Sequence, residues 1–176
     1  MTSPVLIFPG IGNSGAQHWQ SQWEQLNPDF VRISQRDWDN PVCEEWVAVL
    51  ESAVQQLGPS VVIAAHSLAC LAVVHWAARS CLPIKAALLV AVPDPDGPHF
   101  PAEAKGFASL PQQALPFSSI VVTSSNDPYA SVAHAEACAL AWGSDLVKMG
   151  NIGHINANSG LGLWPEGYAL LQQLRN

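Results

Sequence analysis

The sequence alternates short apolar runs with longer helix-like segments along its whole length, and this alternation constrains the fold more than any other feature. Most of the runs are apolar on both faces, as strands are when helices cover both sides of a parallel sheet. The six runs span residues 5–8, 30–33, 61–65, 86–92, 120–123 and 146–149. Helix candidates lie at residues 16–26, 43–57, 68–80, 129–142 and 161–174. The pattern therefore predicts an α/β fold with a doubly wound, mostly parallel sheet.

The length of the chain, 176 residues, suits one domain that spans residues 1–176. A chain of this size buries roughly 70% of its unfolded surface in a single core, so no second domain is needed. One segment, residues 93–117, is rich in proline and breaks the alternation. We expect it to be either a small lid-like loop beside a functional site or a plain surface excursion.

Charge and hydropathy exclude several classes of partner. Seven Lys and Arg stand against fourteen Asp and Glu, without a basic run, so we expect no binding to nucleic acid. Although 49% of the residues are hydrophobic, no run approaches the length of about 18 apolar residues that a membrane span requires. The first residues show no secretory signal, and we expect a soluble, cytoplasmic protein. The four cysteines lack C-x-x-C spacing, which favours reduced thiols over disulfides or a zinc site.

A glycine-rich loop, Gly10-Ile11-Gly12-Asn13-Ser14-Gly15, follows the first predicted strand. Its G-x-G-x-x-G spacing, with Asp37 further along, matches a dinucleotide-binding fingerprint. Pro9 before the loop and the bulky His18 after it disfavour close approach of a pyrophosphate. The alternative is a turn whose backbone N–H groups point into a cavity.

A strand-to-helix turn, Ala65-His66-Ser67-Leu68-Ala69, follows the third predicted strand. It matches the G-x-S-x-G nucleophile elbow with alanine at both glycine positions. Such a turn exposes the Ser67 hydroxyl at the carboxyl end of the sheet and directs the N–H of Leu68 toward an oxyanion. The alternative is that Ser67 only caps the following helix.

Two further polar residues follow the fifth and sixth predicted strands. Asp127 lies just after residues 120–123, and His154 lies in the last loop after residues 146–149. Because parallel strands end at one edge of a sheet, we expect both residues to lie near Ser67. The chain order Ser, Asp, His is that of the α/β-hydrolase triad, in which the histidine activates the serine and the acid orients the histidine.

Other roles for these residues remain open. Asp127 followed by Pro128 is also a good helix start, and His154 could be a loop histidine bonded to the backbone. We expect His18, His75 and His134 to be structural or surface residues of helices, and we expect neither a metal site nor a cofactor.

Several local motifs resemble the retinoblastoma-binding protein 9 / YdeN family of small serine hydrolases, within the α/β-hydrolase superfamily. The most specific is Gly153-His154-Ile155-Asn156, which continues through Ser159-Gly160 to Trp164-Pro165-Glu166-Gly167. The others are Pro9-Gly10 with Gln17-His18-Trp19, Gln35-x-Asp37-Trp38-x-x-Pro41, His66-Ser67-Leu68 and Asn126-Asp127-Pro128-Tyr129.

The resemblance implies Ser67 as nucleophile, Asp127 as acid and His154 as base, with Leu68 and Ile11 supplying the oxyanion-hole N–H groups. It implies a minimal α/β-hydrolase domain, a three-layer αβα sandwich with about six strands in the order 2-1-3-4-5-6. The family's eponymous interaction uses an L-x-C-x-E segment. The nearest string here, Pro41 to Glu45, lacks the leucine, so we do not expect that interaction.

The function expected from the sequence is hydrolysis of a small-molecule ester, or less readily an amide, with small or medium acyl groups. For the substrate-binding wall we expect Gly10, Trp38, Phe100 and Phe107, since the aromatic side chains would form an apolar surface. The competing function is a ligand-binding or protein-interaction module that keeps the fold without useful turnover. A dinucleotide-binding protein is a further alternative.

Overall fold

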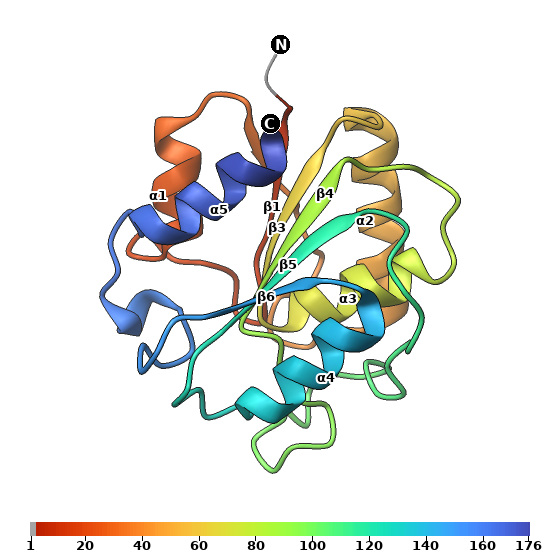
Figure 1. Ribbon diagram of the computed structural model, residues 1–176. Coiled ribbons are helices and arrows are strands. Elements are labelled where there is room, and N and C mark those ends of the chain that lie inside the picture. Colours follow the sequence, from red (N-terminus) through yellow and green to blue (C-terminus); the bar gives the residue numbers. More distant parts are fainter. Residues whose placement is uncertain (1–2) are drawn as a thin grey trace.

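A parallel sheet of six strands lies at the centre of the computed structural model, which describes residues 3–176 (Figure 1). The strands run in the spatial order β2-β1-β3-β4-β5-β6, and every neighbouring pair is parallel. This confirms the predicted sheet. The strands are β1 (Val5–Phe8), β2 (Phe30–Arg32), β3 (Val62–His66), β4 (Ala86–Val90), β5 (Ser118–Thr123) and β6 (Asp145–Lys148).

Helices cover both faces of the sheet (Figure 1). On one face lie α1 (Trp19–Leu26) and α5 (Pro165–Arg175), and on the other lie α2 (Cys43–Leu57), α3 (Leu68–Ala77) and α4 (Val132–Trp142). A short 3₁₀ helix, η1 (Ala157–Ser159), precedes α5. Three helices begin later than predicted because local caps set their starts. The side chain of His18 caps α1, that of Ser131 caps α4, and Pro165 is the first residue of α5.

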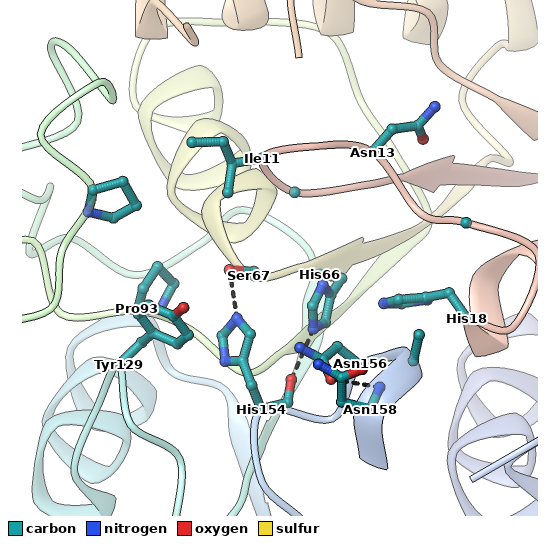
Figure 2. A pocket seen from close by; sticks show the side chains of 14 residues that line it. Ile11, Asn13, His18, His66, Ser67, Pro93, Tyr129, His154, Asn156 and Asn158 are labelled. Carbon is teal, nitrogen blue, oxygen red and sulfur yellow. Dashed lines mark hydrogen bonds between the residues drawn. The ribbon is translucent and has the colours of Figure 1, made fainter. Parts of the chain in front are cut away.

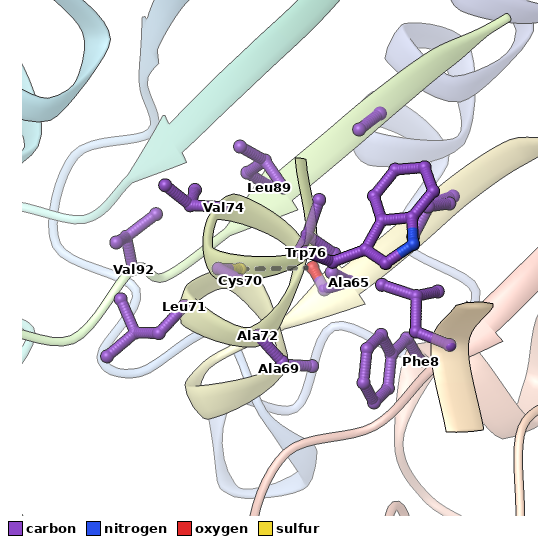
Figure 3. Packing of buried hydrophobic residues seen from close by; sticks show 14 of the residues in the cluster. Phe8, Ala65, Ala69, Cys70, Leu71, Ala72, Val74, Trp76, Leu89 and Val92 are labelled. Atoms are coloured by element: carbon purple, nitrogen blue, oxygen red, sulfur yellow. Dashed lines mark hydrogen bonds between the residues drawn. The ribbon is translucent and has the colours of Figure 1, made fainter. Parts of the chain in front are cut away.

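The core is divided by the sheet into two clusters, because successive side chains of a strand point to opposite faces. Leu6, Ile63 and Leu89 pack toward α2, α3 and α4, whereas Ile7 and Leu88 pack toward α1 and α5. Figure 3 shows the first cluster around α3. Every residue of α3 from Leu68 to Trp76 is buried, which explains why its sequence is apolar on all sides.

The connection between β4 and β5, all of which is described, contains neither a helix nor an extended strand. It is nevertheless anchored at several points. The N–H of Cys43 donates to the carbonyl of Lys105 at 2.9 Å, and the N–H of Lys105 donates to Pro41 at 3.0 Å. Phe107 is fully buried beside Trp46, with ring centroids 5.9 Å apart. The segment is therefore held against α2 rather than standing away from the surface.

None of the helices between residues 3 and 176 is long and apolar enough to cross a membrane.

Candidate active site

Ser67 occupies a sharp turn between β3 and α3. Its φ of 55° lies in the left-handed region, which is uncommon for a residue with a side chain. The turn is fixed to the end of β4 by a hydrogen bond from the Ser67 N–H to the Val90 carbonyl at 2.8 Å. Ala65 and Ala69, which replace the glycines of the usual motif, are both fully buried. Alanine is thus small enough at both positions for the predicted elbow to form.

The surroundings of Gly10, the first glycine of the glycine-rich loop, explain why a glycine is needed there. A Cβ atom at this position would lie 3.0 Å from the His66 carbonyl oxygen and 3.0 Å from Ser67 Cβ. The loop therefore passes directly against the elbow. This gives Gly10 a packing role that involves no nucleotide. The helix after the loop also starts only at Trp19, so its N-terminus does not directly follow Gly15.

The side chains of Ser67, His154 and Asp127 form one chain of hydrogen bonds. The Ser67 hydroxyl donates to Nε2 of His154 at 2.8 Å. Nδ1 of His154 donates to the Asp127 carboxylate and lies 2.9 Å from each of its oxygens. The side chain of Asp127 is only 2% exposed, and its Oδ1 also accepts the N–H of Tyr129 at 2.9 Å. Three residues from three separate loops are thus brought together, in the arrangement required to deprotonate a serine.

The loop that carries His154 is held by hydrogen bonds from two aromatic side chains, those of His66 and Trp19. Nε2 of His66 donates to the carbonyl of His154 at 2.9 Å (Figure 2). The indole Nε1 of Trp19 donates to the next carbonyl, that of Ile155, at 2.8 Å. Two consecutive carbonyls are therefore fixed, and with them the position of the imidazole.

Sequence reasoning missed the residues that join the Asp127 and His154 loops. The Oδ1 atom of Asn126 accepts the N–H of Gly153 at 2.7 Å, and the hydroxyl of Ser124 accepts the N–H of Ile152 at 3.1 Å. Asn126 directly precedes Asp127 in the Asn126-Asp127-Pro128-Tyr129 motif, so the motif itself was the available signal.

Two backbone N–H groups beside the elbow have no hydrogen-bond partner among the described residues. Within residues 3–176, neither the N–H of Leu68 nor that of Ile11 donates to another protein group. Leu68 opens α3, where the helix dipole favours negative charge. The loop of Ile11 packs against the same elbow through Gly10. Both groups are therefore available to an oxyanion.

A cavity of about 270 Å³ opens above Ser67 (Figure 2). Most of its wall is formed by Gly10, Ile11, His18, His66, Ser67, Pro93, Pro101, Tyr129, His154, Asn156 and Asn158. Among these, Gly10, Ile11, Ser67 and His154 were predicted site residues, and Pro93 and Pro101 come from the proline-rich segment, for which a lid-like loop and a plain surface excursion were both expected.

Three predicted wall residues are not brought to this cavity. Phe107 is 0% exposed and packs in the core, because the segment after β4 turns back onto α2. Phe100 and Trp38 are partly buried and pack against the same core cluster. Trp38 instead supports the glycine-rich loop through its backbone, since its carbonyl accepts the N–H of Gly12 at 2.9 Å. None of the three forms part of the cavity wall around Ser67.

Two further histidines lie next to His154 and are held in their neutral form. Burial, assisted by the positive charge of Arg32, lowers the pKa of His18 to about 3. Burial likewise lowers the pKa of His66 well below its usual value. His18 and His66 therefore add no positive charge to the surroundings of His154.

Within the described residues, no group of three or more His, Cys, Asp or Glu side chains could hold a metal ion.

Comparison with known proteins gives a consistent result. Residues 5–173 match the model of a family described as serine hydrolase. A YdeN-like hydrolase from Pectobacterium atrosepticum SCRI1043 has a TM-score of 0.87 and 30% identity, covering 98% of this chain and 90% of that chain. The ydeN gene product of B. subtilis has a TM-score of 0.82 and 20% identity, with 98% of each chain covered.

An esterase from Thermogutta terrifontis has a TM-score of 0.69 and 16% identity, covering 98% of this chain and 90% of that chain. At 20% identity or less, the similarity shows the fold alone. A search of curated proteins gave no significant match.

Proposed function

Because this chain belongs to the serine hydrolase family and has the fold of the YdeN-like α/β hydrolases, we propose that it hydrolyses small carboxylic esters through Ser67, His154 and Asp127. The observation that best supports the proposal is the continuous hydrogen-bonded chain from Ser67 Oγ through both ring nitrogens of His154 to the Asp127 carboxylate.

In the first step, Ser67 Oγ attacks the ester carbonyl while its proton passes to Nε2 of His154. The carbonyl oxygen becomes an oxyanion and is stabilised by the N–H groups of Leu68 and Ile11. Asp127 stabilises the imidazolium and keeps Nδ1 as its donor. The tetrahedral intermediate then collapses, the ester C–O bond breaks, and the alcohol leaves with the proton from His154.

In the second step, water attacks the acyl group on Ser67. His154 takes a proton from the water and returns it to Ser67 Oγ as the acid product leaves. The reaction needs no electron acceptor and no group beyond the protein, the ester and water.

The size of the cavity supports small substrates. Its volume of about 270 Å³ is below the range of about 300–1,000 Å³ that is typical of sites for drug-sized ligands. An ester with a short acyl chain fits this space. An ester is also the less demanding substrate, since an alkoxide leaves more readily than an amide nitrogen.

The first prediction concerns the nucleophile. Replacing Ser67 with alanine should lower kcat on p-nitrophenyl acetate by roughly 10⁴- to 10⁶-fold, because the three residues act as one unit. Wild type should also be labelled at Ser67 by a fluorophosphonate probe, which mass spectrometry of the tryptic peptide would detect. An unlabelled but folded wild type would instead indicate a binding module, and undiminished turnover by Ser67→Ala would contradict the proposal.

A further inference from the structure

The cavity above Ser67 has two chemically different sides. Ile11, Pro93 and the ring of Tyr129 form an apolar side, whereas His18, Asn156 and Asn158 form a polar side (Figure 2). A site that only accommodated alkyl chains would have no use for the second side. The polar side is therefore where a polar group of the substrate would form hydrogen bonds.

His18 has a defined tautomer. Its Nδ1 accepts the N–H of Gln20 at 3.2 Å and caps α1, so Nδ1 carries no hydrogen. Because burial lowers the pKa of His18 to about 3, the ring is neutral at physiological pH. A neutral imidazole with a bare Nδ1 must carry its hydrogen on Nε2. His18 is thus a hydrogen-bond donor and not a cation.

This donor is unpaired. The side chain is part of a residue that is 4% exposed, and Nε2 has no hydrogen-bond partner within residues 3–176. Buried polar atoms in native proteins nearly always have a partner, so an exception in a cavity wall marks a group that can serve a ligand or the chemistry of the site. In Figure 2 the ring points toward His66, and both residues line the cavity.

The unpaired donor belongs to the same cavity wall as Ser67 and His154. The ring centroids of His18 and His66 are 4.7 Å apart, and those of His66 and His154 are 5.0 Å apart. The ring of His66 thus contacts the rings of both His18 and His154. A group a few bonds from the ester carbonyl on Ser67 would reach it.

We propose that Nε2–H of His18 is a specificity determinant that binds an oxygen acceptor of the substrate a few bonds from the scissile carbonyl. This inference rests on the proposed ester hydrolysis and narrows its substrate class. The preferred substrates are small esters with an ether, hydroxyl or carbonyl oxygen in the acyl or alcohol part, rather than plain alkyl esters. A buried donor left without its acceptor disfavours the alkyl analogue.

The test uses pairs of esters that differ only by oxygen in place of methylene. For the acyl part, p-nitrophenyl methoxyacetate is compared with p-nitrophenyl butyrate. For the alcohol part, 2-methoxyethyl acetate is compared with butyl acetate. The ratio of kcat/KM values within each pair is divided by the ratio of the hydroxide-catalysed rates, which removes the intrinsic reactivity of each ester.

Two variants separate the donor of His18 from its capping role. In His18→Asn the side-chain oxygen can still accept the Gln20 N–H, but no donor reaches the position of Nε2. In His18→Gln the amide nitrogen can reach that position, but the cap is lost. The exposed neighbour Gln17, changed to alanine, is the control for substitution in this loop.

We expect wild type to favour the oxygen-containing ester in one of the two pairs. The pair that shows this preference identifies whether His18 binds the acyl or the alcohol part of the substrate. His18→Asn should lower that ratio about tenfold, the loss expected for one neutral hydrogen bond, and His18→Gln should restore most of it. Gln17→Ala should leave the ratio as in wild type.

Three results would overturn the inference. They are a wild type without preference in either pair, a ratio unchanged in His18→Asn, and equal losses in His18→Asn and His18→Gln. If wild type hydrolysed none of the four esters and Ser67 resisted the fluorophosphonate probe, the proposed function would fall, and this inference with it.

Discussion

At the scale of single residues, the site depends on a close contact between the glycine-rich loop and the elbow. The atoms that a Cβ at position 10 would meet are the His66 carbonyl oxygen and Ser67 Cβ, both at 3.0 Å. Neither is the end of a flexible side chain, so the turn itself would have to shift. Gly10 therefore fixes the position of the nucleophile through space rather than through a special backbone conformation.

Replacing Gly10 with alanine should lower kcat/KM on p-nitrophenyl acetate by about 10- to 100-fold, because displacing a catalytic group by a fraction of an ångström disrupts its alignment. Gly15 is the matched control, since a Cβ there meets no atom within 4 Å. Gly15→Ala should therefore retain far more activity than Gly10→Ala. Equal activities of the two variants, with circular dichroism spectra like that of wild type, would show that the contact is unimportant.

The positions of the three candidate catalytic residues were predictable because they follow from the strand order of a parallel sheet. Ser67, Asp127 and His154 could be grouped because parallel strands end at one edge of a sheet. The bond from His66 to the His154 carbonyl could not be predicted, since it joins positions 88 residues apart. Such a bond depends on the register of two loops, which no local pattern encodes.

At the scale of elements, the start of α5 depends on one glycine. Trp164 has a φ of 43° and precedes Pro165 at the first helical position. Its indole is stacked with that of Trp23 at 6.0 Å and lies directly on Gly167. A Cβ at position 167 would come within 2.2 Å of Trp164 Cε3. The Trp164-Pro165-Glu166-Gly167 motif, read from the sequence only as a family signature, therefore has a packing reason.

Gly167→Ala should lower the free energy of unfolding by about 1–3 kcal/mol, the usual cost of forcing extra volume into a packed core. Helix propensity alone would predict the opposite sign, a gain of about 1 kcal/mol. The cost of displacing the Trp164 indole should outweigh this gain. Urea denaturation followed by tryptophan fluorescence measures the difference. Gln173→Ala, on the exposed side of the same helix, should change the value by less than about 0.5 kcal/mol.

Strands and helices were predictable to within a few residues because short apolar runs alternate with longer helix-like segments along the chain. The segment between β4 and β5 interrupts this alternation, and Phe107, expected to form part of a substrate-binding wall, is instead fully buried. Phe107 enters the core between α2 and α3, and the ring of His75 bonds to its carbonyl at 3.2 Å. Tertiary packing alone decides whether an aromatic residue in an irregular segment faces the core or a cavity.

At the scale of the whole molecule, the apolar composition follows from the two core clusters. The sheet is buried on both faces at its centre, so the central strands β1 and β4 are apolar at every position, and α3 is interior on all sides. A consequence is that the polar residues of the site are also buried. His18, 4% exposed, and His66, 5% exposed, are the two titratable groups for which this matters most.

This burial should make the fold sensitive to acid. In the unfolded chain each histidine binds a proton near pH 6.5, whereas in the folded protein His18 does so only near pH 3, and the pKa of His66 is also lowered. Between these values the unfolded state binds more protons, so the free energy of unfolding decreases as the pH falls below 6.5. Above pH 6.5 these two groups contribute no pH dependence.

The expected slope is at most about 1.4 kcal/mol per pH unit for each histidine. Urea denaturation at pH 7.5, 6.5, 5.5 and 4.5 would measure it. Subtracting the slope of His18→Asn, whose amide does not titrate, cancels the contribution of the carboxylates and isolates His18. The variant should therefore lose stability less steeply than wild type below pH 6.5. Parallel curves would mean that His18 takes up its proton in the folded state as readily as in the unfolded chain, which would contradict the lowering of its pKa by burial.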